Sequence, residues 1–283
     1  MGTHKIKIGI IGGSGLDDFA KNFLIDSKVI ERENVISDFG YPSSDIYQGT
    51  VSNIPVALIF RHGVGHTVSP TNVNYRGNVE ALKNLGCTHI LASTACGSLS
   101  ASIGPGQLVI PDNFIDCTTK RDGTFFDGTS AKFGGVRHVP MEPSFHPATA
   151  DSLLLAAQTL GLDVKKGGTI VAIEGPRFSS RAESKTWRLW GGDLINMTTC
   201  PEVCLAKEAG LLYAAVAIAT DYDSWREPEE FVSATSVMSV FKENAWKVKN
   251  LLVKAIEIIG NMDWDQHIND LKDVIDKANV SKN

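Results

Sequence analysis

Short apolar runs recur along the chain, and most of them end in glycine or polar residues. Runs of small and β-branched residues are typical of strands buried on both faces of a sheet, although one run alone does not exclude a buried helix. The runs span residues 6–11, 56–60, 87–93, 107–110, 167–173 and 211–219, with shorter strand-like runs between residues 28 and 60 and within 191–199.

Apolar residues at helical spacing lie between many of these runs. The expected helices span residues 74–86, 149–161, 181–190, 201–210, 233–260 and about 264–278. At one helix start, Ser180 and Glu183 have the spacing of a capping box. The alternation of strands and helices, without an internal repeat or linker, predicts one α/β domain over residues 1–283. We expect the helices from about residue 233 onward to pack on that domain.

The composition is that of an ordinary globular protein, with 283 residues, 43% hydrophobic and 21% charged. A net charge of −5 offers no basic face for nucleic acid, although backbone amides with a few Arg or His can still bind an anion locally. The N-terminal apolar run is too short and glycine-broken for a signal peptide, and no run is long enough to span a bilayer. We therefore expect a cytoplasmic protein, with the nucleus as a second compartment, that binds neither nucleic acid nor membrane.

The five cysteines are scattered, odd in number and without a Cys-x-x-Cys pair. Most lie among apolar or small residues, so we expect reduced and mostly buried thiols. Cys200 and Cys204 are four residues apart, which leaves a disulfide or a two-ligand metal site as a minor alternative.

Three expected strands end in residues that can bind an anion. Ser14 stands in a glycine-rich turn after the first strand, where backbone amides can approach an anion. This turn lacks the complete dinucleotide and P-loop patterns. Arg61 and His62 follow a second strand, and Thr94 follows a third. Because open α/β sheets bind ligands beyond the carboxyl ends of their strands, the sequence predicts one shared anion pocket.

These residues also have ordinary structural interpretations. The glycine turn could be only a tight connection, and His62 could be a core histidine. His62 and His66 are four residues apart, but the two glycines between them disfavour a helix and no third zinc ligand is evident. We rank the anion site first and a metal site last.

Two acids, Asp221 and Asp223, follow the strand at 211–219. If the backbone stays extended, both side chains point the same way, into the space where α/β sheets bind ligands. The alternative is that one acid caps a helix and the other is solvated. Phe178 is equally open, since it could stack on a flat heterocycle or belong to the core.

Taken together, six motifs resemble the trimeric purine nucleoside phosphorylase family, and most closely its methylthioadenosine phosphorylase branch. They occur in the family's order, from residue 6 to about residue 260, so the set is specific although each motif alone is weak. The motifs are Ile10-Ile-Gly-Gly-Ser-Gly-Leu16, Arg61-His-Gly-x-x-His66, Ser93-Thr-Ala-Cys-Gly-Ser-Leu99, Glu174-Gly-Pro-Arg-Phe-Ser-Ser-Arg-Ala-Glu183, Asn196-Met-Thr-Thr-x-Pro-Glu-Val203 and Ala219-Thr-Asp-Tyr-Asp223.

The resemblance implies a nucleoside phosphorylase-like α/β fold, with a twisted mixed sheet that is partly barrel-like and flanked by helices. It also implies a homotrimer and a reaction in which inorganic phosphate, as co-substrate, attacks the anomeric carbon of a nucleoside and the purine leaves. No metal or organic cofactor is expected.

The resemblance assigns residues to three parts of a site. The phosphate-binding residues are Ser14, Arg61, His62, Thr94, Ala95 and Thr198. The purine pocket comprises Phe178, Ser179, Ile195, Asn196, Met197, Asp221, Tyr222 and Asp223. The apolar sugar end comprises Val232, Ala234 and Val237, with His138 and, less firmly, Val280 from a neighbouring subunit.

Asp221 is the implied catalytic residue, because it can carry a proton at purine N7 or hydrogen-bond to one there. A carboxylate also accepts from the 6-amino group of adenine, whereas the branch that prefers 6-oxopurines has Asn at this position. We therefore expect cleavage of methylthioadenosine to adenine and methylthioribose 1-phosphate. A 6-oxopurine or methylthioinosine phosphorylase is the alternative, and a purine-nucleotide sensor without activity is a more distant one.

Two residues depart from the pattern of close relatives, which usually carry Thr and Val where this sequence has Ser14 and Ala234. Ser14 keeps the hydroxyl. The smaller Ala234 predicts a looser methylthio pocket that tolerates larger 5′-substituents.

Overall fold

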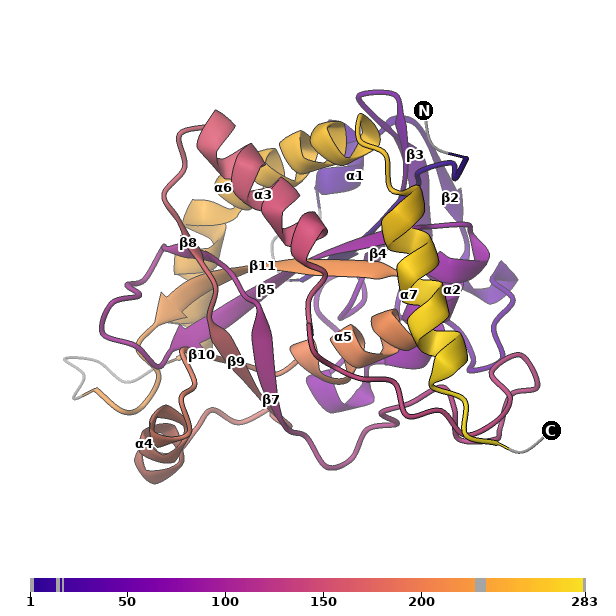
Figure 1. The fold of residues 1–283 in the computed structure, drawn as a ribbon. Helices are drawn as coiled ribbons and strands as arrows, with labels where there is room; N and C mark the ends of the chain where they lie inside the picture. Colours follow the sequence, from indigo (N-terminus) through magenta and orange to yellow (C-terminus); the bar gives the residue numbers. More distant parts are fainter. Residues whose placement is uncertain (1–2, 14–15, 17, 227–232, 282–283) are drawn as a thin grey trace.

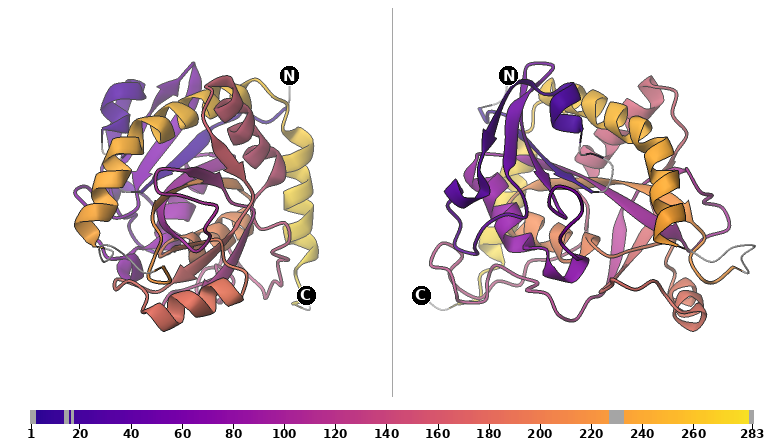
Figure 2. Two further views of the ribbon diagram at one scale, coloured as in Figure 1. Left: turned by 90° about the vertical axis from the view of Figure 1, so that its left-hand side faces the viewer. Right: turned by 180° about the vertical axis from the view of Figure 1, so that it is seen from behind.

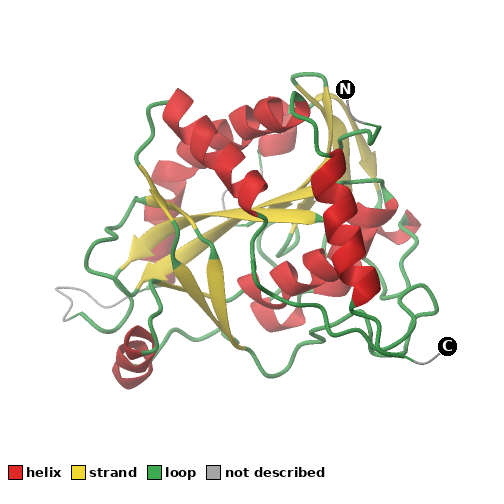
Figure 3. Ribbon diagram, viewed as in Figure 1, coloured by secondary structure: helices red, strands yellow, loops and turns green. Residues whose placement is uncertain are grey.

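The computed structural model describes residues 3–13, 16, 18–226 and 233–281. In this part of the chain, eleven strands form one mixed sheet with helices around it (Figures 1 and 3), which confirms the expected α/β class. The strands are β1 Ile8–Gly12, β2 Ile25–Ile30, β3 Ile46–Val51, β4 Ile54–Phe60, β5 His89–Ser98, β6 Leu108–Ile110, β7 Asn113–Cys117, β8 Val164–Lys166, β9 Thr169–Ile173, β10 Leu194–Asn196 and β11 Leu212–Asp221.

The helices begin and end close to the predicted positions. They are α1 Phe19–Phe23, α2 Tyr75–Asn84, α3 Pro147–Thr159, α4 Arg181–Leu189, α5 Thr199–Glu208, α6 Ala234–Gly260 and α7 Asp265–Lys277, with short 3₁₀ turns at Arg32–Asn34 and Pro70–Asn72. The capping box predicted at α4 is confirmed, since Ser180 accepts from the Glu183 amide and Glu183 accepts from the Ser180 amide.

The buried runs are apolar on both sides because helices cover both faces of the central strands. Along β11, Ala214 and Val216 pack in a core with α3 and α6, whereas Tyr213 and Ala215 pack in a second core with α2 and α5. Figure 1 shows these two helix pairs on opposite sides of β5 and β11. None of the described helices is both long and apolar enough to cross a membrane.

Strand β5 is the branch point of the sheet, whose main order is β2-β3-β4-β1-β5-β10-β9-β7. It pairs in parallel with β1 only as far as Ala92, and with β11 along most of its length. Its last residues, Gly97 and Ser98, pair antiparallel with β10. The sheet therefore curls as β5 leaves β1 and turns toward β10 (Figure 2). Residues 94–97 of β5, beyond its pairing with β1, line a cavity.

Five details differ from the sequence prediction. Strand β5 continues past residue 93 to Ser98, and β11 continues past residue 219 to Asp221. Strand β7 lies between residues 111 and 148, where no strand or helix was expected, and β8 lies just before β9; both are short edge strands without a long apolar run. The five-residue helix α1 was also not predicted, because it is too short to show helical periodicity.

Candidate active site

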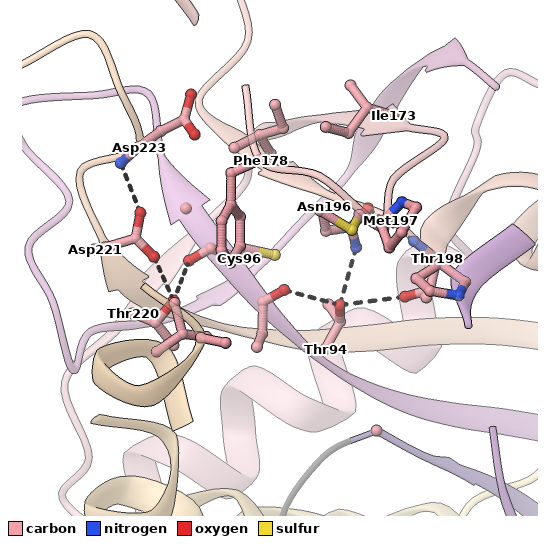
Figure 4. Close-up of a pocket in the computed structure, with 18 of the residues that line it drawn as sticks. Thr94, Cys96, Ile173, Phe178, Asn196, Met197, Thr198, Thr220, Asp221 and Asp223 are labelled. Atoms are coloured by element: carbon pink, nitrogen blue, oxygen red, sulfur yellow. Dashed lines mark hydrogen bonds between the residues drawn. The ribbon is translucent and has the colours of Figure 1, made fainter. Parts of the chain in front are cut away.

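A cavity of about 270 Å³ opens at the carboxyl ends of the central strands, beside the branch of β5. This volume approaches the range usual for small-molecule sites. Fourteen of the predicted residues line it (Figure 4). They are Arg61, His62, Thr94, Ala95, Phe178, Ser179, Ile195, Asn196, Met197, Thr198, Asp221, Asp223, Ala234 and Val237.

Arg61 lies at one end of the cavity and is only 1% exposed. Its Nε and Nη2 donate to the two carboxylate oxygens of Glu202, at 2.5 and 2.7 Å, and Nη1 donates to the Ser93 carbonyl at 3.0 Å. Tyr213 donates to the same carboxylate at 2.8 Å. Burial alone would lower the pKa of Arg61, but Glu202 raises it above its ordinary value. The guanidinium fork predicted to face an anion is thus occupied by Glu202, and only the outer N–H groups remain for a ligand.

His62 follows Arg61 and stacks on His66 with 4.2 Å between ring centroids. Burial, together with the charge of Arg61, lowers the pKa of His62 to about 3, so its ring is neutral at pH 7. Nδ1 lies 2.9 Å from the Val68 carbonyl. Because a carbonyl only accepts, Nδ1 carries the proton and Nε2 is left as an acceptor.

A small hydroxyl cluster lies next to these two residues (Figure 4). Asn196 donates through Nδ2 to the hydroxyls of Thr94, at 2.9 Å, and Thr199, at 2.7 Å. The Thr94 and Thr198 hydroxyls lie 3.5 Å apart. Because Thr94 Oγ1 accepts a hydrogen bond from Asn196, the Thr94 hydroxyl can itself donate a hydrogen bond to a ligand. Asn196 therefore orients the hydroxyls, and both of its own donors are already used.

Two carboxylates mark the opposite end of the cavity (Figure 4). Asp221 accepts from the Thr220 hydroxyl and from the Asp223 amide, both at 2.7 Å. Burial raises the pKa of Asp221 despite these bonds. Both acids face the cavity, but not because they alternate along an extended strand, as the sequence predicted. Instead, β11 ends at Asp221 with a bulge, and Asp223 has a φ of 47°.

Unpartnered polar atoms surround Asp223. Its Oδ2 and the hydroxyls of Ser179 and Ser184 are buried and have no hydrogen-bond partner of ordinary geometry among the described residues. Burial raises the pKa of Asp223, while the nearby hydroxyls of Ser184 and Ser179 oppose this shift. Buried polar atoms without partners are costly, so this end of the cavity has donors and an acceptor available for a polar ligand.

The wall between the two ends is largely apolar. Phe178 stands beside Asp223 and is 38% exposed, which places its ring at the cavity rather than in the core. Helix α6 contributes Ala234, Val237 and Met238. Further lining residues, to which the resemblance assigned no role, are Gly13, His66, Pro70, Cys96, Gly97, Ile173, Pro176, Thr220 and Met238.

Five predicted residues stand elsewhere or cannot be placed. Tyr222 does not line the cavity; its ring packs against Trp225 and Arg226. His138 and Val280 also lie outside the lining, in a segment where the His138 amide bonds to the Ala278 carbonyl. Ser14 and Val232 lie outside the described residues.

The cysteines and histidines form no metal cluster in the described part of the chain. All five cysteines are free thiols and three of them are buried, so the alternative of a Cys200–Cys204 disulfide is wrong.

The chain is similar to known proteins over most of its length. The profile of the Phosphorylase superfamily matches residues 7–257. The S-methyl-5′-thioadenosine phosphorylase of Anopheles gambiae is 52% identical over 272 residues, covering 95% of each chain. That of Danio rerio is 52% identical over 264 residues, covering 93% of this chain and 92% of the relative.

Two solved structures from Schistosoma mansoni share the fold. A methylthioadenosine phosphorylase in complex with adenine has a TM-score of 0.90 at 38% identity, covering 98% of this chain and 99% of that chain. A mutant adenosine/methylthioadenosine phosphorylase in complex with methylthioadenosine has a TM-score of 0.89 at 37% identity, with the same coverage. The resemblance inferred from the six motifs is thereby confirmed, and the chain belongs to the Phosphorylase superfamily and, within it, to the S-methyl-5′-thioadenosine phosphorylases.

Proposed function

We propose that this chain catalyses the phosphorolysis of S-methyl-5′-thioadenosine to adenine and S-methyl-5-thio-α-D-ribose 1-phosphate. The observation that carries the proposal is the polarity of one cavity, with anion-binding groups at one end and two buried carboxylates at the other. The products would enter purine and methionine salvage, in the cytoplasm and also in the nucleus.

Phosphate binds at the Arg61 end. The hydroxyls of Thr94 and Thr198, the outer N–H groups of Arg61 and the amide of Ala95 donate to its oxygens, and Ser14 adds a further hydroxyl. Through Nε2, the neutral ring of His62 accepts a hydrogen bond from the one O–H group that the phosphate dianion retains.

Charge pairing explains how the bound phosphate assists the reaction. Because Glu202 neutralises Arg61, these side chains cancel little of the phosphate's negative charge. That charge then stabilises the cationic sugar that forms as the bond from C1′ to N9 breaks. A phosphate oxygen forms the new bond to C1′, and the electron pair of the broken bond passes to the purine.

The purine binds at the Asp221 end. Asp221 donates or holds the proton at N7, so that the base leaves as a neutral molecule, and the raised pKa of this carboxyl supports that role. The Asp221 carboxylate also accepts from the 6-amino group, Asp223 is a supporting acceptor with Ser179 beside it, and Phe178 stacks on the ring. Ile195 and Met197 complete the apolar wall.

The sugar end selects the methylthio group through α6. Ala234 and Val237 offer only apolar surface there, and Val232 precedes them in the sequence. Because Ala234 is small, we expect tolerance of larger 5′-substituents. The 6-oxopurine alternative is disfavoured by Asp221, since a carboxylate would face O6 without a donor.

The test is a phosphate-dependent assay with methylthioadenosine, inosine and methylthioinosine in parallel. We expect adenine release only when phosphate is present, and little turnover of the 6-oxopurine nucleosides. Inosine cleaved as fast as methylthioadenosine would contradict the adenine assignment. Nucleoside binding without base release would indicate a sensor instead of an enzyme.

We also propose a homotrimer in which His138 and Val280 of each chain complete the sugar end of a neighbour's cavity. Both residues lie outside the lining of their own chain's cavity, and residues 136–138 contact residues 278–280, which supports this. Light scattering should give a mass of three chains. A monomeric mass with full activity would contradict it.

A further inference from the structure

A buried arginine outside the cavity contacts two of its walls. Arg121 lies in the loop between β7 and α3, and its side chain is 2% exposed. Nε donates to Glu174 Oε1 at 3.0 Å, and Nη2 donates to the Glu174 carbonyl at 2.7 Å. Nη1 donates to the carbonyls of Met197 and Cys200, both at 2.7 Å, and to the Tyr75 hydroxyl at 3.0 Å. Each guanidinium nitrogen is therefore committed to a named acceptor.

The two carbonyls bound by Nη1 bracket the segment that carries Thr198. Met197 lies before Thr198, and Cys200 lies two residues after it, at the start of α5. This start is irregular, since Thr198 makes no side-chain cap and Cys200 has non-helical angles of φ −103° and ψ 137°. Asn196 Oδ1 accepts from the amides of Thr198 and Thr199 at 3.4 Å, and Arg121 fixes the carbonyls of Met197 and Cys200 on either side of them.

The other contacts of Arg121 hold the end of β9. Ile173 lines the cavity, and Glu174 follows it. Glu174 also accepts from the amides of Thr119 and Lys120, which fixes the turn that presents Arg121. Burial works to raise the pKa of Glu174, but these amides and the side chains of Thr71 and Arg121 lower it to about 2, so Glu174 is charged at neutral pH.

We propose that Arg121 is a positioning residue for phosphorolysis, which holds the Met197–Cys200 segment and the end of β9 at one spacing. Thr198 is thereby presented to phosphate, and Ile173 and Met197 to the purine. The inference rests on the proposed function for the identity of the two ligands. Arg121 itself does not line the cavity, so it acts only through these segments.

Three variants test the proposal. Arg121→Ala removes every contact of the guanidinium, and Arg121→Lys keeps the charge but offers only an ammonium with three donors in place of the planar fork. The matched control is Arg76→Ala. Arg76 pairs with Asp122 and Asp127 of the same loop and lies over Phe39, and none of these three partners lines the cavity.

The readouts are kcat and the KM for each substrate, adenine binding by calorimetry, and the thermal midpoint. We expect Arg121→Ala to raise the KM for phosphate and lower kcat, each by roughly tenfold to 100-fold, because small displacements of a binding group are costly. Millimolar methylguanidinium should restore part of this loss, although guanidinium compounds otherwise destabilise proteins. Arg76→Ala should change either constant by less than about threefold.

Arg121→Lys keeps the test decisive if Arg121→Ala does not fold. We expect it to fold with a raised phosphate KM and weaker adenine binding. Wild-type kinetic constants in the Lys variant would overturn the proposal. The proposal would also be overturned if the losses of kcat and the increases in KM in the Arg121 and Arg76 variants simply followed the decrease in thermal midpoint, and if methylguanidinium restored no activity to Arg121→Ala.

The outcome is separable from that of the proposed function. If the wild-type protein does not cleave methylthioadenosine, the proposed function fails, and the Arg121 variants are measured with the nucleoside that it does cleave. An unchanged KM for phosphate would then still overturn the positioning role.

Discussion

The substitution Asp221→Asn tests the purine end of the cavity with little disturbance of the fold. Asp221 Oδ1 accepts from the Asp223 amide, so an asparagine must keep its oxygen on that side. Its Nδ2 then faces Thr220, whose hydroxyl can accept from it and turn its own proton fully toward the Cys96 carbonyl, 3.2 Å away. Every local partner is thus satisfied in the variant.

The expected cost lies in substrate recognition. The second proton of Nδ2 points into the cavity, where the carboxylate formerly accepted from the base. Loss of a hydrogen bond to a charged group costs about 1.5–3 kcal/mol, and a buried donor left facing a donor costs about 1–3 kcal/mol more. A total of about 3–4 kcal/mol corresponds to a loss of roughly two to three orders of magnitude in kcat/KM for methylthioadenosine. A 6-oxopurine gains a donor to O6, so its kcat/KM should fall much less or rise.

The assay compares kcat/KM for methylthioadenosine and methylthioinosine at saturating phosphate. Asp151→Asn, on the exposed side of α3 and paired with Lys166, is the control. Burial raises the pKa of Asp221 in the folded chain, so its charged form opposes folding at neutral pH. The Asn variant should therefore be no less stable than the wild type. Equal losses for both nucleosides, or a loss for methylthioadenosine below about fivefold, would refute the assignment.

Three further predictions concern the phosphate end and the core. Glu202→Gln should destabilise the protein by about 3–5 kcal/mol, because it leaves Arg61 buried without its counter-charge; saturating phosphate should recover more stability in urea unfolding than it adds to the wild type. Thr198→Val should raise the KM for phosphate by roughly tenfold and leave calorimetric adenine binding unchanged, with Asp151→Asn again as the control; weaker adenine binding would contradict the separation of the two ends. Burial lowers the pKa of His89 to about 3 and that of His146 to about 4, from 6.5. Below about pH 6.5 the unfolded chain therefore binds protons that the folded chain does not, and the free energy of unfolding falls as the pH decreases toward these values. His89→Asn should flatten the acid limb of the unfolding curve, by up to about 1.4 kcal/mol per pH unit, and substitution of the exposed His4 should leave it unchanged.

The sequence predicted the central strands because burial on both faces leaves a continuous apolar signal, as along β11. It also predicted the end of β4 at Phe60, whereas β5 and β11 run further than predicted; strand ends in a parallel sheet converge on one place. The short strands β7 and β8 gave no such signal, because an edge strand with few buried residues has little apolar pattern. The bulge and the positive φ at Asp223 depend on contacts with other segments, so strand alternation gave the wrong reason for a shared orientation.

Candidate site residues were predicted best where a motif stands directly at a strand end. Arg61 and Asp221 are such residues, and both line the cavity. Their partners were harder to find, since Glu202 lies 141 positions from Arg61, and Arg121 lies 76 positions from Met197. Neither Glu202 nor Arg121 was recognised, because a charged residue in a helix or loop looks like ordinary solvated surface until the fold buries it.

The missed partner changes the chemistry more than the missed strands do. From the sequence, an Arg and a His at a strand end suggest a strongly cationic pocket that binds phosphate by charge. In the structure Glu202 neutralises Arg61, and burial keeps His62 uncharged at neutral pH. Phosphate is then held mainly by hydroxyl and N–H donors and retains most of its negative charge. A cationic pocket would bind the phosphate more tightly but would also screen it from the cationic sugar, so the lower charge favours the transition state over the ground state.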